Sequence, residues 1–198
     1  MSNVLEFDPV PHEYKLDGEV IPSVSQIIDR AGLYGKGKAF FKREHAERGT
    51  RVHLATELHD LGTLDMASVA GTKLEGYLVA WQKFLSDTGS EILEIEKRAW
   101  AEVDGMKYAM TVDRVLRLPD GRVFVCDLKS GSKAAKPHGA QVAGYAIGME
   151  QALGLEIDAQ MCVYVGPKGK YKVGLYEEPE WGELWMRCLN GFYGRAAA

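Results

Sequence analysis

Three charged residues of this chain have the types and spacing of a site that could bind a metal ion. Asp113 comes before a turn at residues 119–121, and Asp127 and Lys129 follow that turn. Because the two acids stand at similar separations from the turn, pairing of the flanking segments would bring them together. Residues two apart on a strand point to the same face, so Lys129 would accompany Asp127. Such charges are costly to bury without a partner, and a divalent cation would be a suitable one.

The segment that carries these residues reads as two strands joined by a tight turn. The turn is Pro-Asp-Gly, in which proline presets φ and glycine accepts positive φ. Residues 108–131 are therefore predicted to form a hairpin with the charged residues at its open end. The flanking runs have the apolar, often β-branched residues expected of sheet, namely Val112, Val115, Leu118, Val123, Val125 and Leu128.

The arrangement of Asp113, followed after the turn by the run DLKSG at residues 127–131, resembles a known signature. It is the paired-acid and Asp-x-Lys motif of the PD-(D/E)XK nuclease superfamily, in its RecB-like and phage exonuclease branch. The opening FDPVPHEYKLDGEVIPSVSQII, residues 7–28, is also similar to that of small phage exonucleases and of the mitochondrial genome maintenance exonuclease. Ser25 stands there in place of a usual threonine. Met110 stands in place of a usual glycine three residues before the first acid, which bears on the local shape and on substrate choice.

A histidine on a predicted helix is a further candidate ligand. The run RGTRVHLATE, residues 48–57, resembles the helical histidine motif of the RecB-like branch, in which the histidine binds metal. His53 and Glu57 are four apart and share one helical face. Alone, such a pair is more typical of an exposed surface or of a satisfied core histidine. The acids that follow in the family's order favour the ligand. Thr50 is predicted to be the N-cap of this helix.

The resemblance implies a metal site made by His53, Asp113, Asp127 and the main-chain carbonyl of Leu128. Hard oxygen ligands with one nitrogen suit Mg²⁺ or Mn²⁺, bound as one ion or two. Three separated cysteines do not form an iron–sulfur motif, so the cluster that some relatives carry is not expected here. They are predicted to be buried apolar fillers: Cys126, Cys162 and Cys188.

The remaining catalytic candidates surround that site. Lys129 would lie beside the attacking water, where it could orient the water, take its proton or offset charge. Gln141 and Tyr145 are four apart and reproduce the Q-x-x-x-Y pair that follows Asp-x-Lys in RecB-like nucleases, where they would hold the strand or the water. Glu57 and Glu96 are accessory candidates, although a solvated strand edge is the favoured interpretation for Glu96.

A basic segment between residues 36 and 51 contains aromatic residues at Phe40 and Phe41. Such a run is often only a solvated face, but cations interleaved with aromatic rings also suit single-stranded nucleic acid. Both interpretations stay open. The candidate DNA contacts are Thr50, Arg51, Arg48, Lys42 and Ser130.

Hydrophobic periodicity and turn signals predict the remaining elements. An α/β (α+β) fold follows, in the order helix, three antiparallel strands, helix, strand. This order resembles the restriction-endonuclease-like αβββαβ core of the superfamily, which implies a central mixed sheet flanked by helices, with N- and C-terminal additions. One nuclease domain over 1–198 is expected, divided into 1–70, 71–166 and 167–198. The predicted elements are a hairpin at Asp17-Gly18, a helix capped by Ser23 or Ser25, helices at 72–88, 138–153 and from 179, and strands at 91–103, 159–165 and 171–176.

Composition sets the class of protein. A chain of 198 residues with 46% hydrophobic and 26% charged residues is typical of a soluble globular domain. No apolar run is long enough to cross a bilayer and no leader is recognised, so an intracellular protein is expected. The resemblance to phage exonucleases implies a cytoplasmic, phage-encoded protein of a bacterial host. The net charge of −4 is unusual for a DNA enzyme, but a local basic surface can lie on an acidic body.

The resemblance implies a Mg²⁺- or Mn²⁺-dependent DNA exonuclease that leaves 5′-phosphates, with a role in phage recombination or DNA processing. Its substrate would be single-stranded DNA or DNA ends, and a single-strand-annealing protein is a partner by analogy. One alternative is a non-catalytic nucleic-acid-binding module with a relict site, against which the intact Asp113, Asp127 and Lys129 argue. A hydrolase of smaller phosphoesters is another, but the basic segment favours a polymer.

Overall fold

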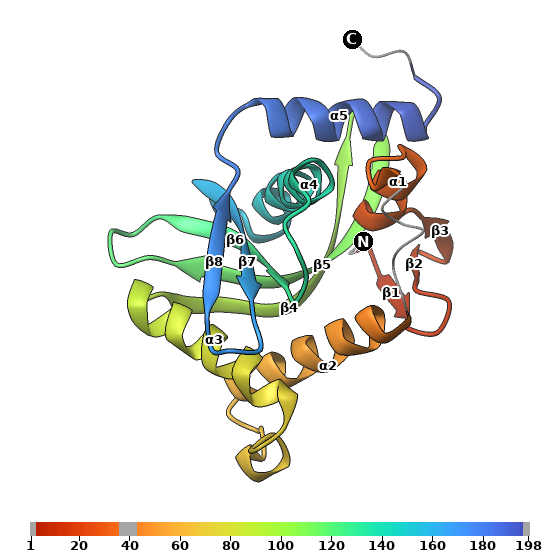
Figure 1. Cartoon of the computed structure of the whole chain (residues 1–198). Helices are drawn as coiled ribbons and strands as arrows, with labels where there is room; N and C mark the ends of the chain where they lie inside the picture. Colours follow the sequence, from red (N-terminus) through yellow and green to blue (C-terminus); the bar gives the residue numbers. More distant parts are fainter. Residues whose placement is uncertain (1–2, 36–42, 196–198) are drawn as a thin grey trace.

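A five-stranded mixed sheet forms the centre of the protein (Figure 1). The computed structural model describes residues 3–35 and 43–195. The strands lie in the order β4-β5-β6-β7-β8, which is also their order along the chain. Their bounds are β4 Glu91–Val103, β5 Met106–Arg117, β6 Val123–Lys129, β7 Ala159–Val165 and β8 Tyr171–Leu175.

Short turns make most of the neighbouring strands antiparallel, whereas a helix makes one pair parallel. The turn at Gly121, whose φ is 90°, joins β5 to β6, and the N–H of Gly121 donates to the carbonyl of Leu118 at 2.9 Å. Helix α4, Ala135–Leu153, then crosses over the sheet, so β7 runs parallel to β6. This helix–three-strand–helix–strand order confirms the predicted core.

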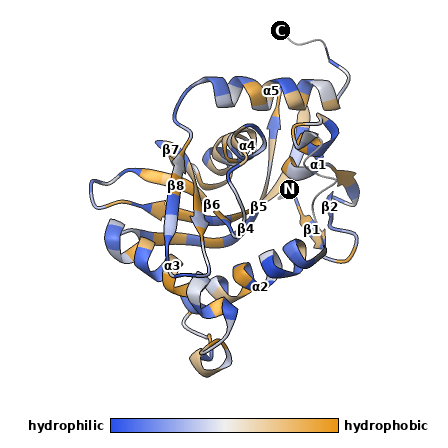
Figure 2. Ribbon diagram, viewed as in Figure 1, coloured by the Kyte–Doolittle hydropathy of each residue, from blue (hydrophilic) through white to orange (hydrophobic). Residues whose placement is uncertain are grey.

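Helices cover both faces of the sheet (Figure 1). Two hydrophobic cores result, one around Trp185 on the α4 side and one around Trp81 on the α3 side. Hydrophobic residues run along the strands, whereas the helices carry both hydrophobic and hydrophilic residues (Figure 2). On one face lie α1 Val24–Arg30, α4 and α5 Glu180–Phe192; on the other lie α2 Arg43–Asp60, the short 3₁₀ helix η2 Met66–Ser68 and α3 Lys73–Thr88.

A second, three-stranded antiparallel sheet packs beside β5. It contains β1 Leu5–Asp8, β2 Glu13–Leu16 and β3 Glu19–Ile21. The N–H of Ala109 on β5 donates to the carbonyl of Pro22 at 2.9 Å, and the hydroxyls of Tyr14 and Thr111 lie 2.6 Å apart. The N-terminal segment is thereby joined to the strand that carries Asp113.

The predicted fold class is confirmed, as are most elements. Ser23 rather than Ser25 caps α1, through a capping box with Gln26. The prediction that Thr50 is an N-cap is wrong, because α2 continues through it and its hydroxyl donates back to the carbonyl of Ala46 at 3.2 Å. This i to i−4 bond satisfies the hydroxyl inside a helix, so the residue type alone does not mark a helix start.

Two further details concern the lengths of elements and their hydrophobicity. Helix α4 begins at Ala135, earlier than residue 138, and strand β1 has no counterpart among the predicted elements. Within the described ranges, no helix combines the length and the apolarity that crossing a bilayer requires. The three cysteines are buried, as predicted for apolar fillers.

Candidate active site

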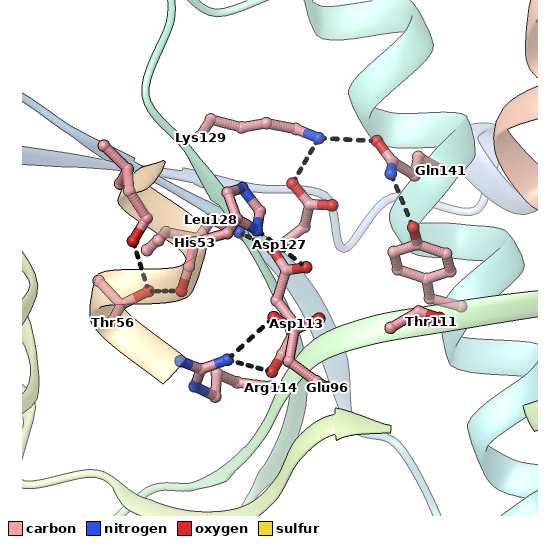
Figure 3. A network of polar contacts seen from close by, with 12 residues as sticks. His53, Thr56, Glu96, Thr111, Asp113, Arg114, Asp127, Leu128, Lys129 and Gln141 are labelled. Atoms are coloured by element: carbon pink, nitrogen blue, oxygen red, sulfur yellow. Dashed lines mark hydrogen bonds and ion pairs between the residues drawn. The ribbon is translucent and has the colours of Figure 1, made fainter. Parts of the chain in front are cut away.

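Side chains from both helical layers and from three neighbouring strands converge at one edge of the central sheet (Figure 3). His53 comes from α2, and Asp113 from β5. Asp127 and Lys129 come from β6, and Gln141 comes from α4. His53 and Gln141 are separated in the sequence by helix α3 and three strands, and the fold brings them together.

The two aspartates lie opposite each other where β5 and β6 end their pairing. Asp113 accepts a hydrogen bond from the N–H of Leu128 at 2.7 Å through one carboxylate oxygen. Its other oxygen lies 3.4 Å from Nδ1 of His53. Both aspartates are buried, whereas the side chain of His53 is one third exposed. His53 is therefore the ligand candidate that solvent reaches from the α2 side.

Lys129 connects the acids to α4. Its Nζ lies 2.5 Å from Oδ2 of Asp127 and donates to Oε1 of Gln141 at 2.9 Å. The Gln141 amide in turn donates to the hydroxyl of Tyr145 at 2.8 Å. Residues 141 and 145 share the sheet-facing side of α4, and Asp127 and Lys129 share one face of β6. The pairs that the sequence placed on common faces thus meet in one chain of contacts.

Glu96 on β4 joins His53 and Asp113 in a group of three ligand atoms that all lie within 4.8 Å of one another. The solvated strand edge favoured from sequence is not what the structure shows, because the half-buried Glu96 faces the site. The register of β4 and β5 sets Glu96 across from Asp113, between the pairs Ile95–Arg114 and Lys97–Val112. The sequence contained a signal for this pairing. Glu96 precedes the Asp104-Gly105 turn between β4 and β5 by as many residues as Asp113 follows it.

The backbone at Glu96 is strained. Its φ is 46°, in the left-handed region that side-chain-bearing residues rarely adopt. Val112 and Val115 on the facing strand both pack into the core on the α4 side, so the strand alternation changes phase beside this point. Strain of this kind costs about 1–3 kcal/mol and clusters at functional sites. The distortion aims the Glu96 carboxylate toward Asp113.

Sequence reasoning missed the buried Arg114, which holds Glu96 in place. Its Nε donates to Asp60 at 2.7 Å, and its Nη1 contacts Glu96 at 3.4 Å and the carbonyl of Asp113 at 2.5 Å. Asp60, at the end of α2, also accepts from Nε1 of Trp81 on α3 at 3.0 Å. Arg114 thus links the sheet to the helix that carries His53. The available signal was the position of Arg114 directly after Asp113, a candidate metal ligand, in the sequence.

Burial has the largest effect on the pKa of each acid in the site. Burial, and then the charge of Asp113, raises the pKa of Glu96 to about 7. Burial raises the pKa of Asp127 to about 6, although the charge of Lys129 opposes this shift. Burial also disfavours the charge of Asp113, but His53 outweighs it and the pKa of Asp113 is lowered. His53 and Lys129 therefore do not fully offset the cost of burying charged carboxylates in the site, because the pKa values of Glu96 and Asp127 stay raised.

The two cationic side chains are held in their charged forms. Burial lowers the pKa of His53, but the charge of Asp113 and the contact with it raise that pKa to about 9. Burial likewise disfavours the Lys129 ammonium, but the charges around it, that of Asp127 first, together outweigh burial and raise its pKa above the usual range. Lys129 is thus a cation at neutral pH.

The donor set fits a hard divalent cation. His53, Glu96 and Asp113 supply one nitrogen and two carboxylates, a combination that suits Mg²⁺ or Mn²⁺. Oδ2 of Asp127 is buried, and its short contact with Lys129 lacks hydrogen-bond geometry. Lys129 is therefore the group that a cation entering the site would have to share this oxygen with. Leu128 reaches the site through its N–H, which fixes the adjacent main chain.

The other predicted residues lie at varying distances from this centre. Glu57, half-buried on α2, raises the pKa of Glu96 through its charge and so lies near it. Ser130 lies close to α2, because a Cβ at Gly49 would be 3.9 Å from its hydroxyl. Thr50 and Arg51 are exposed and Arg48 is half-buried, whereas Lys42, with Lys36, Lys38, Phe40 and Phe41, falls outside the described residues.

A cavity of about 330 Å³ opens over the site. One end is lined by His53, Glu96 and Asp113 together with Asp127 and Lys129. The other end reaches the N-terminal sheet. Its volume lies at the lower end of the range usual for pockets that take a small ligand.

Comparison with solved structures finds the same fold elsewhere. A protein from Eubacterium rectale named "Putative exonuclease" aligns with a TM-score of 0.55 and 14% sequence identity, covering 89% of this chain and 82% of its own. The fold is shared. The protein SSO0001 aligns with a TM-score of 0.39 and 15% identity, over 86% of this chain and 85% of its own. No protein-family model matches the chain, and no curated protein matches it either.

Proposed function

We propose that this protein is a Mg²⁺- or Mn²⁺-dependent deoxyribonuclease of the RecB-like and phage exonuclease branch of the PD-(D/E)XK superfamily. The observation that carries the proposal is the convergence of His53, Glu96 and Asp113 with the Asp127–Lys129 pair at one cavity. The fold shared with a protein named an exonuclease supports it. The product would carry a 5′-phosphate.

Each residue of the site has a definable task in phosphodiester hydrolysis. His53, Glu96, Asp113 and Asp127 would hold the cation, which when bound lowers the pKa of a water and stabilises charge on the leaving oxygen. Lys129, as a cation held between Asp127 and Gln141, would offset charge on the scissile phosphate rather than remove a proton.

The neighbouring residues keep these groups in position. Gln141 fixes Lys129 by a hydrogen bond and is itself fixed by Tyr145. Arg114 holds the Glu96 carboxylate and ties it to α2 through Asp60. Such support matters because a small misplacement of a catalytic group lowers the rate strongly.

Three finer points rest on the family resemblance and are proposed on that basis. The whole chain would act as one nuclease domain, with residues 71–166 as its catalytic core. The enzyme would process DNA ends in phage recombination, and a single-strand-annealing protein would be its partner.

The test is a cleavage assay with end-labelled single-stranded and double-stranded DNA, with Mg²⁺, Mn²⁺ or EDTA. We expect wild type to release nucleotides with either metal and none with EDTA. Lys129→Ala should reduce the rate about a hundredfold or more. Lys133→Ala is the matched control, because Lys133 lies over the ring of Tyr176 near the site without contacting the acids. Metal-independent binding without cleavage, or hydrolysis of small phosphoesters only, would contradict the proposal.

A further inference from the structure

The end of the cavity away from the acids is walled by aromatic rings. Phe7, His12 and Tyr14 of the N-terminal sheet line it together with Arg98 of β4. The ring centroids of Phe7 and Tyr14 are 4.6 Å apart, and those of Phe7 and His12 are 5.2 Å apart with the planes nearly perpendicular. His12 is exposed, Phe7 is half-buried and Tyr14 is buried. The three rings therefore pack in layers, and the less buried rings, those of Phe7 and His12, face the cavity.

This wall is fixed relative to the acids. The hydroxyl of Tyr14 lies 2.6 Å from that of Thr111, which precedes Asp113 by two residues on β5. Because two residues along a strand span about 7 Å, the Tyr14–Thr111 contact lies about that far from Asp113 along β5. Arg98 pairs with Thr111 in the sheet register, and its guanidinium lies 4.9 Å from the Phe7 centroid. An aromatic surface and a cation thus stand about one nucleotide's length from the catalytic centre.

We propose that Phe7, His12, Tyr14 and Arg98 form a binding site for one unpaired nucleobase of the substrate strand, next to the phosphate that is cleaved. This inference rests on the proposed function and extends it to the class of substrate. Aromatic rings beside a cation are the surface on which single-stranded nucleic acid stacks. The bases of a duplex are already stacked on their neighbours, so only an unpaired base can enter. The site therefore selects a single strand or a frayed end.

Competing occupants fit the wall less well. A wholly apolar ligand would leave the exposed Arg98 and His12 without a complementary group, and a free phosphate would not use the rings. A nucleotide uses both, because its base offers a flat apolar face and its phosphate offers negative charge.

The experiment measures binding, with Ca²⁺ in place of Mg²⁺, by fluorescence anisotropy of a labelled single-stranded oligonucleotide and of a blunt duplex. Phe7→Leu and His12→Ala should each weaken single-strand binding about tenfold and leave duplex binding unchanged. Val10→Ala is the matched control, since Val10 lies exposed in the same hairpin and does not line the cavity. Circular dichroism establishes that each variant is folded.

A second arm needs no variant. A single abasic position is moved along the oligonucleotide, and at one position it should weaken wild-type binding about tenfold. The same abasic strand should cause no further loss in His12→Ala, because the base and the ring act as one contact. Additive losses, equal affinity for every abasic strand, or no single-strand binding by wild type would overturn the inference.

The two proposals fail in different ways. If wild type binds the single strand through this wall but cleaves no DNA with any metal, the nuclease proposal fails and the binding site stands. If wild type cleaves DNA and the variants match it in single-strand binding, the nuclease proposal stands and the nucleobase site is wrong.

Discussion

The Glu96 carboxylate lies where a strained backbone, a buried arginine and a second acid meet. Arg114 alone does not neutralise the local charge, because it also serves Asp60. A cation shared with Asp113 and His53 would relieve the repulsion. Glu96 is thus expected to contribute directly to metal binding.

Replacing Glu96 by Gln should weaken Mn²⁺ binding at least about tenfold, because a charged ligand becomes a neutral one. Isothermal titration calorimetry measures the change. Glu94→Gln is the control, since Glu94 lies on the same strand and pairs with Lys97 at 3.1 Å instead. Equal affinities in wild type and Glu96→Gln would remove Glu96 from the ligand set.

His138 is a buried residue near the site whose neutral form is favoured. Its Nδ1 accepts from the N–H of Ala134 at 3.3 Å and lies 2.8 Å from the hydroxyl of Tyr164. Burial, and then the charges of Lys129 and Lys133, lowers its pKa to about 3. The unfolded chain binds a proton here below about pH 6.5, and the folded chain does not until far lower pH. The stability that His138 contributes is therefore lost as the pH falls from 6.5 toward 3.

On going from pH 7 to pH 5, wild type should lose about 2 kcal/mol more free energy of unfolding than His138→Gln, whose side chain does not titrate. Urea denaturation at the two pH values measures both losses. The variant is its own control for all other titrating groups. Parallel losses in the two proteins would show that His138 does not contribute to the acid sensitivity.

Close packing of helices on their neighbours depends on glycine at several contacts. A Cβ at Gly76 of α3 would lie 1.9 Å from the carbonyl oxygen of Pro167, in the turn between β7 and β8. A Cβ at Gly139 of α4 would lie 2.3 Å from the ring of Trp181 on α5. The first contact is with rigid main chain, so it has less room to relax than the second.

Gly76→Ala should lower the free energy of unfolding by about 1–3 kcal/mol, because overpacking outweighs the gain in helix propensity. The comparison is Gly182→Ala in α5, where a Cβ would meet nothing within 4 Å. That change should be neutral or stabilising by up to about 1 kcal/mol. Thermal and urea melts measure both. A stabilising effect at Gly76 would contradict the close approach of α3 to this turn.

The elements that could be predicted from sequence are those with local signals. Helix α3 has apolar residues at helical spacing between the Thr72 cap and Gly89, whose φ is 62°. The prediction failed at Thr50, where a hydroxyl that suits a cap is satisfied inside a helix instead. Strand β1 was missed because it has only four residues, the shortest run in which an alternating pattern can be recognised.

The candidate site was partly predictable for the same reason. Residues of β6 and α4 follow each other closely in sequence, so the faces of Asp127 and Gln141 could be inferred. The link from Arg114 to Asp60 joins residues far apart in the chain. Only the assembled sheet and helices show that contact. The packing of Met110 likewise depends on a residue far away in the sequence. A Cβ at Gly148 of α4 would lie 2.0 Å from Cε of Met110. Gly148 provides the space for the methionine side chain.

Over the whole molecule, the net charge of −4 opposes the approach of a polyanion. A divalent ion bound among the acids would offset part of that charge at the place where the proposed function requires the DNA backbone to bind. The same ion should stabilise the folded state, since it binds the assembled site and not the unfolded chain.

At an Mn²⁺ concentration of about 100 times its dissociation constant, the gain should be about 2.7 kcal/mol, or several degrees in Tm. Differential scanning fluorimetry with increasing Mn²⁺ measures the shift, and EDTA should reverse it. Asp113→Asn should lose the response. Glu91→Gln should keep it, because Glu91 pairs with Arg117 on the surface. A shift that is equal in both variants would indicate nonspecific binding of the ion.

The attachment of the N-terminal sheet to β5 has a consequence for biosynthesis. Tyr14 and Leu16 leave the ribosome well before Ala109 and Thr111, the β5 residues that they pack against or bond to, have been made. The nascent chain must therefore keep its first hairpin undocked until α2, α3, β4 and the start of β5 have been synthesised. A polypeptide interrupted before β5 would lack one wall of the cavity and two of its three acids, Asp113 and Asp127, so the candidate site should be complete only late in translation.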